Sequence, residues 1–188
     1  MTDPAMVLRD ILRVDHAGEY GAIRIYRAQI AIARWRAPDL VAMLEHALGD
    51  EMRHRDRFEA GLRERGLRPC DMLPLWGAGG TLLGGGTALL GREAILVCTE
   101  AVERTVHVHM DDQAAWLVPH APELATAIAA IRDEEVDHLH RAQQGRNTTR
   151  PAAWLRLLDL IVAASTELLV WLSTYGVSSR LRRQIGAR

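Results

Sequence analysis

Six residues that could bind metal repeat at matching places in the two halves of the chain. Each half offers one lone Glu and, 32 residues later, a Glu-x-x-His motif. The six residues are Glu19, Glu51 and His54 in the first half, and Glu103, Glu135 and His138 in the second. Helical residues three positions apart share a face, and four carboxylates with two imidazoles on four helices form the ligand set of a two-metal bundle. The pattern predicts dioxygen activation at a carboxylate-bridged metal pair.

The types of these residues favour iron. Carboxylates can bridge two metals, and imidazole favours iron over magnesium or calcium, although manganese can share such ligands. One Glu-x-x-His pair alone is more typical of a solvated helix face, but two pairs at equal spacing favour a metal centre. We predict two Fe²⁺ per chain, each bound by one imidazole. The bundle template makes Glu19 and Glu103 terminal ligands and makes Glu51 and Glu135 bridges.

The elements that must position these ligands are helices. Helix-forming residues dominate, and strand-like alternation is scarce. Glycine and proline punctuation predicts five helical stretches, at about residues 5–36, 39–64, 80–117, 122–144 and 151–175, with a connection at 67–77. The chain is long enough for one domain over residues 1–188 with a proper core. We therefore predict an all-α protein built on a four-helix bundle.

Composition excludes several other classes of function. The 23 basic and 24 acidic residues nearly balance, and no basic stripe suggests a nucleic-acid partner. Cys70 and Cys98 are the only cysteines and do not resemble a disulfide framework or a zinc site, which fits a reduced cytosolic compartment. The first residues show no basic region followed by an apolar run, so we expect no secretory signal.

Two stretches, residues 72–91 and 160–179, are unusually apolar. The first has twenty residues without a charge, a length that could span a bilayer. However, seven of those twenty are glycine, and the second stretch carries Glu167. We expect both to contact the membrane surface instead of crossing it. The alternative is that they are buried inside the bundle or in a homodimer.

Four segments resemble the signature motifs of the demethoxyubiquinone hydroxylase family. They are DHAGEYGAIRIYRAQ (15–29), DEMRH (50–54), GGGTALLGREAILVCTEAVERTVHVHMDDQ (84–113) and RDEEVDH (132–138). The resemblance covers nearly the whole chain. It implies a ferritin-like bundle with a non-haem di-iron centre, and a monooxygenase that uses O₂ to hydroxylate the ring of a polyprenylated demethoxyubiquinol. That reaction is the penultimate step of ubiquinone biosynthesis.

The resemblance also implies a place in the cell and some partners. Members of the family are peripheral proteins of the inner membrane, so we expect this chain at its cytoplasmic face. There it would meet a substrate whose tail lies in lipid, and it could contact other ubiquinone-biosynthesis proteins. The length of that tail, the electron donor and the oligomeric state stay open.

Some residues are weaker candidates for contact with the substrate. In the family pattern His109 follows Glu103, and it is a candidate for contact with the ring. Leu82, Leu83 and Leu90 are candidates for the tail, although packing in the core explains leucines equally well. The chain departs from the family at Met110, where a tyrosine is common, and any role of that aromatic ring must be filled differently here.

Three other functions are consistent with most of these observations. A ferritin-like protein could oxidise and store iron, and would then bind many irons per chain instead of two. A scaffold could bind quinone and organise other enzymes without turnover. A related di-iron oxygenase could act on another isoprenoid phenol, an alternative that Met110 keeps open.

Overall fold

The computed structural model describes residues 3–146 and 152–177, and every regular element in them is helical. Four long helices form the bundle: α1 (Pro4–Arg36), α2 (Val41–Glu64), α4 (Arg92–Leu117) and α5 (Pro122–Gly145). A short 3₁₀ turn, η1 (Pro38–Leu40), joins the first two. The remaining helices are α3 (Leu73–Leu90) and α6 (Ala153–Thr174). The predicted all-α, ferritin-like bundle with additional apolar helices is confirmed.

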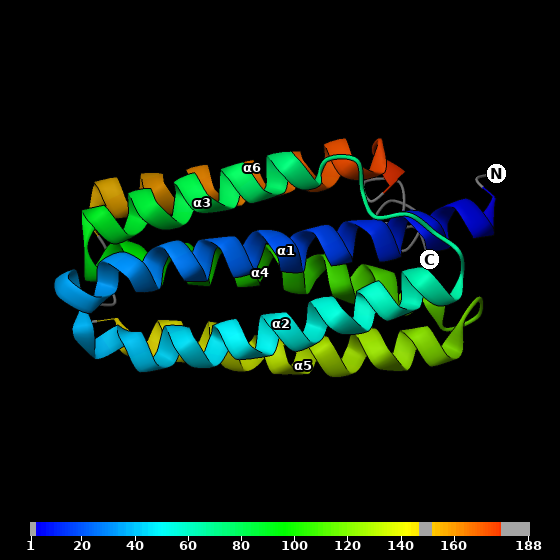
Figure 1. Cartoon of the computed structure of the whole chain (residues 1–188), viewed down its shortest axis with the longest axis horizontal. Helices are drawn as coiled ribbons and strands as arrows, with labels where there is room; N and C mark the ends of the chain where they lie inside the picture. The colour runs from blue at the N-terminus through cyan, green and yellow to red at the C-terminus, as the bar shows by residue number, and fades with distance from the viewer. Residues whose placement is uncertain (1–2, 147–151, 178–188) are drawn as a thin grey trace.

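The helices lie in three layers along a common direction (Figure 1). The middle layer is α1 and α4, which pack on α2 and α5 respectively on one side. On the other side α3 packs on α1, and α6 packs on α4. The indole Nε1 of Trp76 in α3 donates to Ser173 Oγ in α6 at 2.9 Å, so the two apolar helices also meet each other. The bundle is thus covered on one side by the two apolar stretches.

Two hydrophobic clusters hold the bundle together near its two ends. The first contains Leu12, Phe58, Leu62, Met110, Ile128 and Ile131. The second contains Tyr26, Ile30, Leu44, Ile95, Leu96 and Ala142. On each of the four bundle helices, the predicted metal ligands fall between a residue of one cluster and a residue of the other. The apolar ends therefore position a polar middle section.

The predicted helix at residues 80–117 was wrong, because the chain forms two helices there. Gly91 lies between α3 and α4 with φ of 105° and ψ of −174°, a conformation that glycine adopts easily and other residues avoid. The predicted connection at 67–77 was also too long, since α3 begins at Leu73. Pro74 occupies the first turn, where its missing N–H leaves no hydrogen bond unmade. Pro151, the predicted start of the last helix, lies outside the described residues.

The apolar helices leave many large side chains on the surface. In α3, Leu82 is 76% exposed and Leu90 is 58% exposed, and in α6 Leu160 is 64% exposed. Among the described residues, no helix combines the length and the hydropathy that crossing a membrane requires.

Candidate metal centre

The six predicted ligands meet in the middle of the bundle. All are buried, and they come from four helices: Glu19 from α1, Glu51 and His54 from α2, Glu103 from α4, and Glu135 and His138 from α5. Their ligand atoms form two groups, and within each group all atoms lie within 4.8 Å of one another. One group is Glu19, Glu51, His54 and Glu135, and the other is Glu51, Glu103, Glu135 and His138. Only Glu51 and Glu135 belong to both groups.

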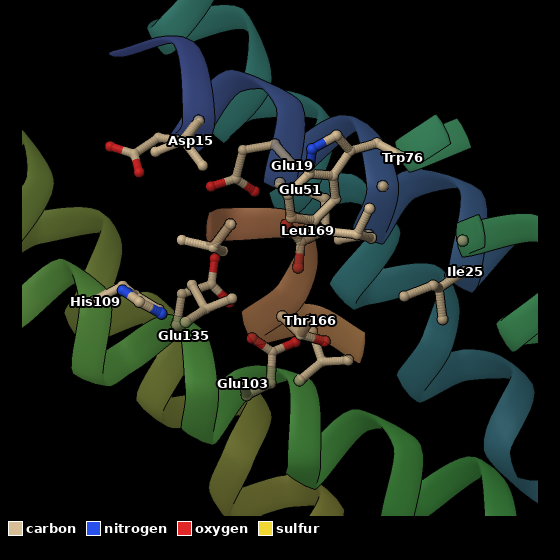
Figure 2. A pocket seen from close by; sticks show the side chains of 18 of the residues that line it. Asp15, Glu19, Ile25, Glu51, Trp76, Glu103, His109, Glu135, Thr166 and Leu169 are labelled. Carbon is tan, nitrogen blue, oxygen red and sulfur yellow. The ribbon is translucent and has the colours of Figure 1, made fainter. Parts of the chain in front are cut away.

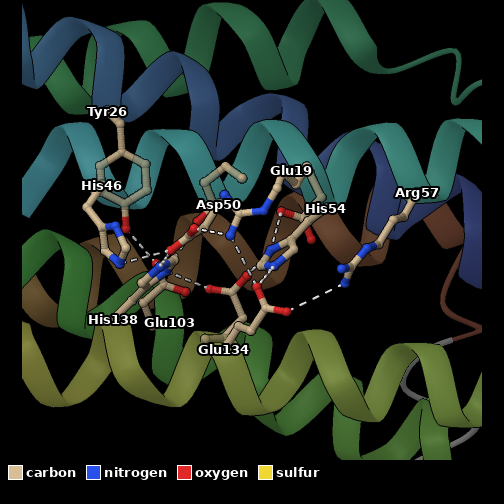
Figure 3. A network of polar contacts seen from close by, with 12 residues as sticks. Glu19, Tyr26, His46, Asp50, His54, Arg57, Glu103, Glu134 and His138 are labelled. Atoms are coloured by element: carbon tan, nitrogen blue, oxygen red, sulfur yellow. Dashed lines mark hydrogen bonds and ion pairs between the residues drawn. The ribbon is translucent and has the colours of Figure 1, made fainter.

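Each imidazole points one nitrogen into this cluster and the other out of it (Figure 3). His54 Nδ1 lies 2.8 Å from Glu135 Oε1, and His138 Nδ1 lies 3.0 Å from Glu135 Oε2. The outward Nε2 atom of His54 lies 3.0 Å from Glu134 Oε2, and that of His138 lies 2.9 Å from Asp50 Oδ2. A carboxylate on the outer nitrogen fixes the tautomer that leaves Nδ1 free to bind a metal.

Burial controls the charge of the cluster. Loss of water raises the pKa of Glu19 well above its ordinary value, and repulsion from neighbouring carboxylates adds to the effect. Burial raises the pKa of Glu103 in the same way. Burial alone would also raise the pKa of Glu135, but its contacts with His138 and His54 lower it to about 2. Without cations, the cluster therefore has to take up protons.

The atoms of the cluster fit bound cations better than they fit one another. Glu51 Oε1, His54 Nδ1 and Glu135 Oε1 are buried and make no well-aligned hydrogen bond with any described residue. The 2.8 Å approach of the last two atoms lacks the alignment of a hydrogen bond. Buried carboxylates without partners are very costly, whereas a metal ion would satisfy all of these atoms at once. The donor set is thus compatible with metal binding.

Tyr26 is a member of the cluster that the sequence analysis missed. Its hydroxyl donates to Glu103 Oε1 at 2.7 Å, and the side chain is buried (Figure 3). Tyr26 follows Glu19 by seven residues, which is two helical turns, so both side chains lie on the same face of α1. This spacing was the available signal, because a polar aromatic residue two turns from a ligand faces the same interior.

A pocket leads from the carboxylates into the apolar layer (Figure 2). Its empty volume is about 930 Å³ including the open mouth, and α1, α3, α4 and α6 all contribute to its wall. Glu19, Glu51, Glu103 and Glu135 line one part of it, and the remainder of the lining is mostly apolar. An apolar pocket with a few convergent polar groups is the usual form of a small-molecule site.

The family model for "Ubiquinone biosynthesis protein COQ7" matches residues 6–173. The chain belongs to the COQ7 family. It is 37% identical over 170 residues to a 3-demethoxyubiquinol 3-hydroxylase of Rhodospirillum rubrum, covering 90% of this chain and 79% of the relative. It is 35% identical over 167 residues to the mouse (Mus musculus) mitochondrial NADPH-dependent 3-demethoxyubiquinone 3-hydroxylase, covering 87% and 75%. Its membership makes this COQ7 protein a hydroxylase of ubiquinone biosynthesis.

The substrate candidates of this COQ7 chain fall in different places. His109 and Leu83 line the pocket, and so does Met110, where the chain departs from the family pattern. Leu82 and Leu90 are exposed on the outer face of α3 and do not line it. His109 Nε2 lies 3.1 Å from Glu167 Oε2, so the one acid in the apolar stretch of α6 meets the imidazole.

Proposed function

We propose that this chain hydroxylates the ring of a polyprenylated demethoxyubiquinol with O₂, at two ferrous ions held by the six buried ligands. The observation that carries the proposal is the pocket, because one continuous space joins four carboxylates to the wall formed by two apolar helices. That space suits a molecule with an aromatic ring to be oxidised and a long apolar tail. The substrate class is the one in the names of the relatives from R. rubrum and mouse.

The two ligand groups suggest how the ions would be held. Glu51 and Glu135, which belong to both groups, would bridge the ions. Glu19 with His54 would complete one site, and Glu103 with His138 the other. When bound, such an iron pair would supply the chemistry that a bundle of helices lacks: each Fe²⁺ would give one electron to O₂, so that, with two protons, one oxygen atom enters a ring C–H bond and the other leaves as water.

The protein itself would position the ligands, fix the tautomers of the two imidazoles and exclude water from the site. Asp50 and Glu134 would hold the imidazoles with Nδ1 inward. The Tyr26 hydroxyl would hold one oxygen of Glu103 by its hydrogen bond. The apolar lining from α3 and α6 would exclude water from the ring while it is oxidised.

We further propose that α3 and α6 rest on the membrane surface. Support comes from the large hydrophobic side chains that these helices expose, including Leu82, Leu89, Leu157, Leu160, Leu168 and Trp171. Exposed apolar patches of this kind mark sites of membrane or protein contact. A tail that leaves the pocket between α3 and α6 would pass directly into lipid. In this arrangement Leu82 and Leu90 would contact lipid, and Leu83 would contact the substrate.

Product analysis in bacteria that accumulate demethoxyubiquinone tests the reaction. The chain is expressed there, and extracted quinones are weighed by mass spectrometry. We expect ubiquinone to appear with the wild-type chain and with Glu45→Ala, which changes an exposed acid on α2, but not with Glu51→Ala. Full activity of the Glu51→Ala protein would refute the assignment of that residue, and absence of ubiquinone with iron-loaded wild type would refute the substrate.

Iron content separates catalysis from storage. We expect two irons per chain in the purified protein, and fewer when one bridging carboxylate is removed. A content of many irons per chain would favour a storage function over hydroxylation.

A further inference from the structure

A polar pair is buried at one end of the pocket. Gln113 Nε2 on α4 donates to Asp15 Oδ1 on α1 at 2.8 Å. Asp15 is 8% exposed and Gln113 is 5% exposed, and both line the pocket. The second carboxylate oxygen of Asp15 and the amide oxygen of Gln113 are buried without a hydrogen-bond partner among the described residues. Such atoms are costly unless a ligand binds them.

The proposed function would place the ring of a bound substrate beside this pair. Asp15 precedes Glu19 by one helical turn, so the two carboxyl groups point to the same side of α1. In Figure 2, Asp15 and His109 lie on one side of the view and Ile25 lies on the other, with Glu19 and Glu135 in between. A ring held at this end would have the carboxylate cluster beside it and the apolar wall for its tail.

We propose that the unpartnered oxygens of Asp15 and Gln113 bind a ring hydroxyl of the reduced substrate, and so select the quinol over the quinone. The inference rests on the proposed function. A quinol hydroxyl donates a hydrogen bond, and both oxygens of the pair accept one. A quinone carbonyl is only an acceptor, so it would face two other acceptors without a proton between them.

The ionisation of Asp15 decides the conditions of the test. Burial raises the pKa of Asp15 to about 7, although its hydrogen bond from Gln113 opposes the shift. A protonated carboxyl group could donate to a quinone carbonyl, so binding is measured at pH 8, where the carboxylate predominates.

Binding of the two redox forms gives the direct measurement. The full chain is loaded with zinc, which takes carboxylate and imidazole ligands but transfers no electrons. A demethoxyubiquinol with a short prenyl tail and its quinone are then dialysed against it without oxygen. We expect the wild type to bind the quinol at least about tenfold tighter than the quinone, the effect of one hydrogen bond to a charged acceptor.

Asp15→Asn should lower that preference by roughly tenfold. If the oxygen of the new amide group at position 15 accepts from Gln113, the NH₂ of that amide faces the pocket. If the NH₂ faces Gln113 instead, the Gln113 amide turns over and presents its own NH₂ to the pocket. In either orientation, one of the two pocket acceptors is replaced by a donor. Gln113→Met removes the second acceptor and should also weaken quinol binding, which keeps the test open if one variant folds poorly. Asp10→Asn is the control, because it removes a buried charge from the same helix and Asp10 pairs with Arg9 outside this pocket.

Two results would overturn the inference: a wild type that binds both forms equally, or two folded variants that keep the wild-type preference. Turnover by the iron-loaded wild type is measured separately by mass spectrometry. A preference that depends on Asp15, in a protein that forms no hydroxylated product, would overturn the reaction and leave the quinol-binding pair standing.

Discussion

Substitution of Gly84 by alanine tests whether the close contact between α1 and α3 shapes the substrate pocket. A Cβ atom at position 84 would lie 2.3 Å from the carbonyl oxygen of Ile25 and 2.8 Å from its Cα. These are backbone atoms of α1, and they cannot rotate away as a flexible side chain can. Gly86, two residues along the same helix, offers a matched control, because a Cβ atom there meets nothing within 4 Å.

The two substitutions should change stability in opposite directions. An ordinary contact is near 3.5 Å, so α3 must move from α1 by about 1 Å at Gly84. Overpacking of this kind costs about 1–3 kcal/mol, and a clash between backbones belongs at the upper end. Alanine is favoured over glycine inside a helix by about 0.5–1 kcal/mol. We therefore expect Gly84→Ala to lower the free energy of unfolding by about 2 kcal/mol and Gly86→Ala to raise it by about 0.5–1 kcal/mol.

Urea unfolding measures the stability, and steady-state kinetics measures the pocket. α3 contributes Gly80 and Leu83 to the pocket wall, so its displacement should raise KM for the quinol. Iron content should stay unchanged, because α3 carries none of the six proposed ligands. Equal stability of the two variants, or a loss of iron in Gly84→Ala, would refute this account of the α1–α3 contact.

Three further predictions concern the carboxylates and their neighbours. Asp50→Ala removes the acceptor for the outer nitrogen of His138 and should weaken iron binding by about 10–100-fold in a chelator competition; unchanged affinity would remove Asp50 from the site. Tyr26→Phe leaves one oxygen of Glu103 without its donor and should lower stability by about 1–3 kcal/mol in thermal unfolding, with little change in iron content. Asp15→Asn concerns a carboxyl group whose pKa burial raises from 3.8 to about 7. The stabilising contribution of this group is complete below pH 3.8 and is lost as pH rises through about 7. In urea unfolding of the metal-free proteins, the free energy of unfolding of the variant, taken relative to that of the wild type, should therefore rise by up to about 3 kcal/mol between pH 5 and pH 8. A gain that does not grow with pH would show that Asp15 keeps an ordinary pKa.

Much of the bundle could be predicted from the sequence because its four main helices obey local rules. Prolines at 38 and 122 and glycines after residues 64 and 144 mark boundaries that the chain uses within a few residues. The region of α3 could not be predicted in the same way. Glycine and proline usually interrupt helices, but here Pro74 begins one and Gly84 allows α3 to lie directly on α1. Whether this region forms a helix depends on its contact with α1, about sixty residues earlier in the sequence, and no local pattern contains that information.

The meeting of the six predicted ligands in one place was the most predictable feature of the site, since equal spacing in two halves is improbable by chance. The positions of the candidates for substrate contact were less predictable. Leu82 and Leu83 are neighbours in sequence, yet only Leu83 lines the pocket, because successive residues of a helix point about 100° apart. Which of the two faces inward depends on how α3 lies on the bundle.

The packing of α2 against α5 decides which acids serve the two imidazoles. Each Glu-x-x-His motif follows directly on an acid, Asp50 in α2 and Glu134 in α5, and the sequence did not indicate what either acid contacts. Asp50 lies four residues before His54, and Glu134 four residues before His138, so each acid shares a helix face with the histidine of its own motif and could serve it by spacing alone. Because α2 and α5 run in opposite directions (Figure 1), each acid instead reaches the histidine of the other helix. The two motifs thus complete each other, and a change in the register of α2 against α5 would disturb both imidazoles together.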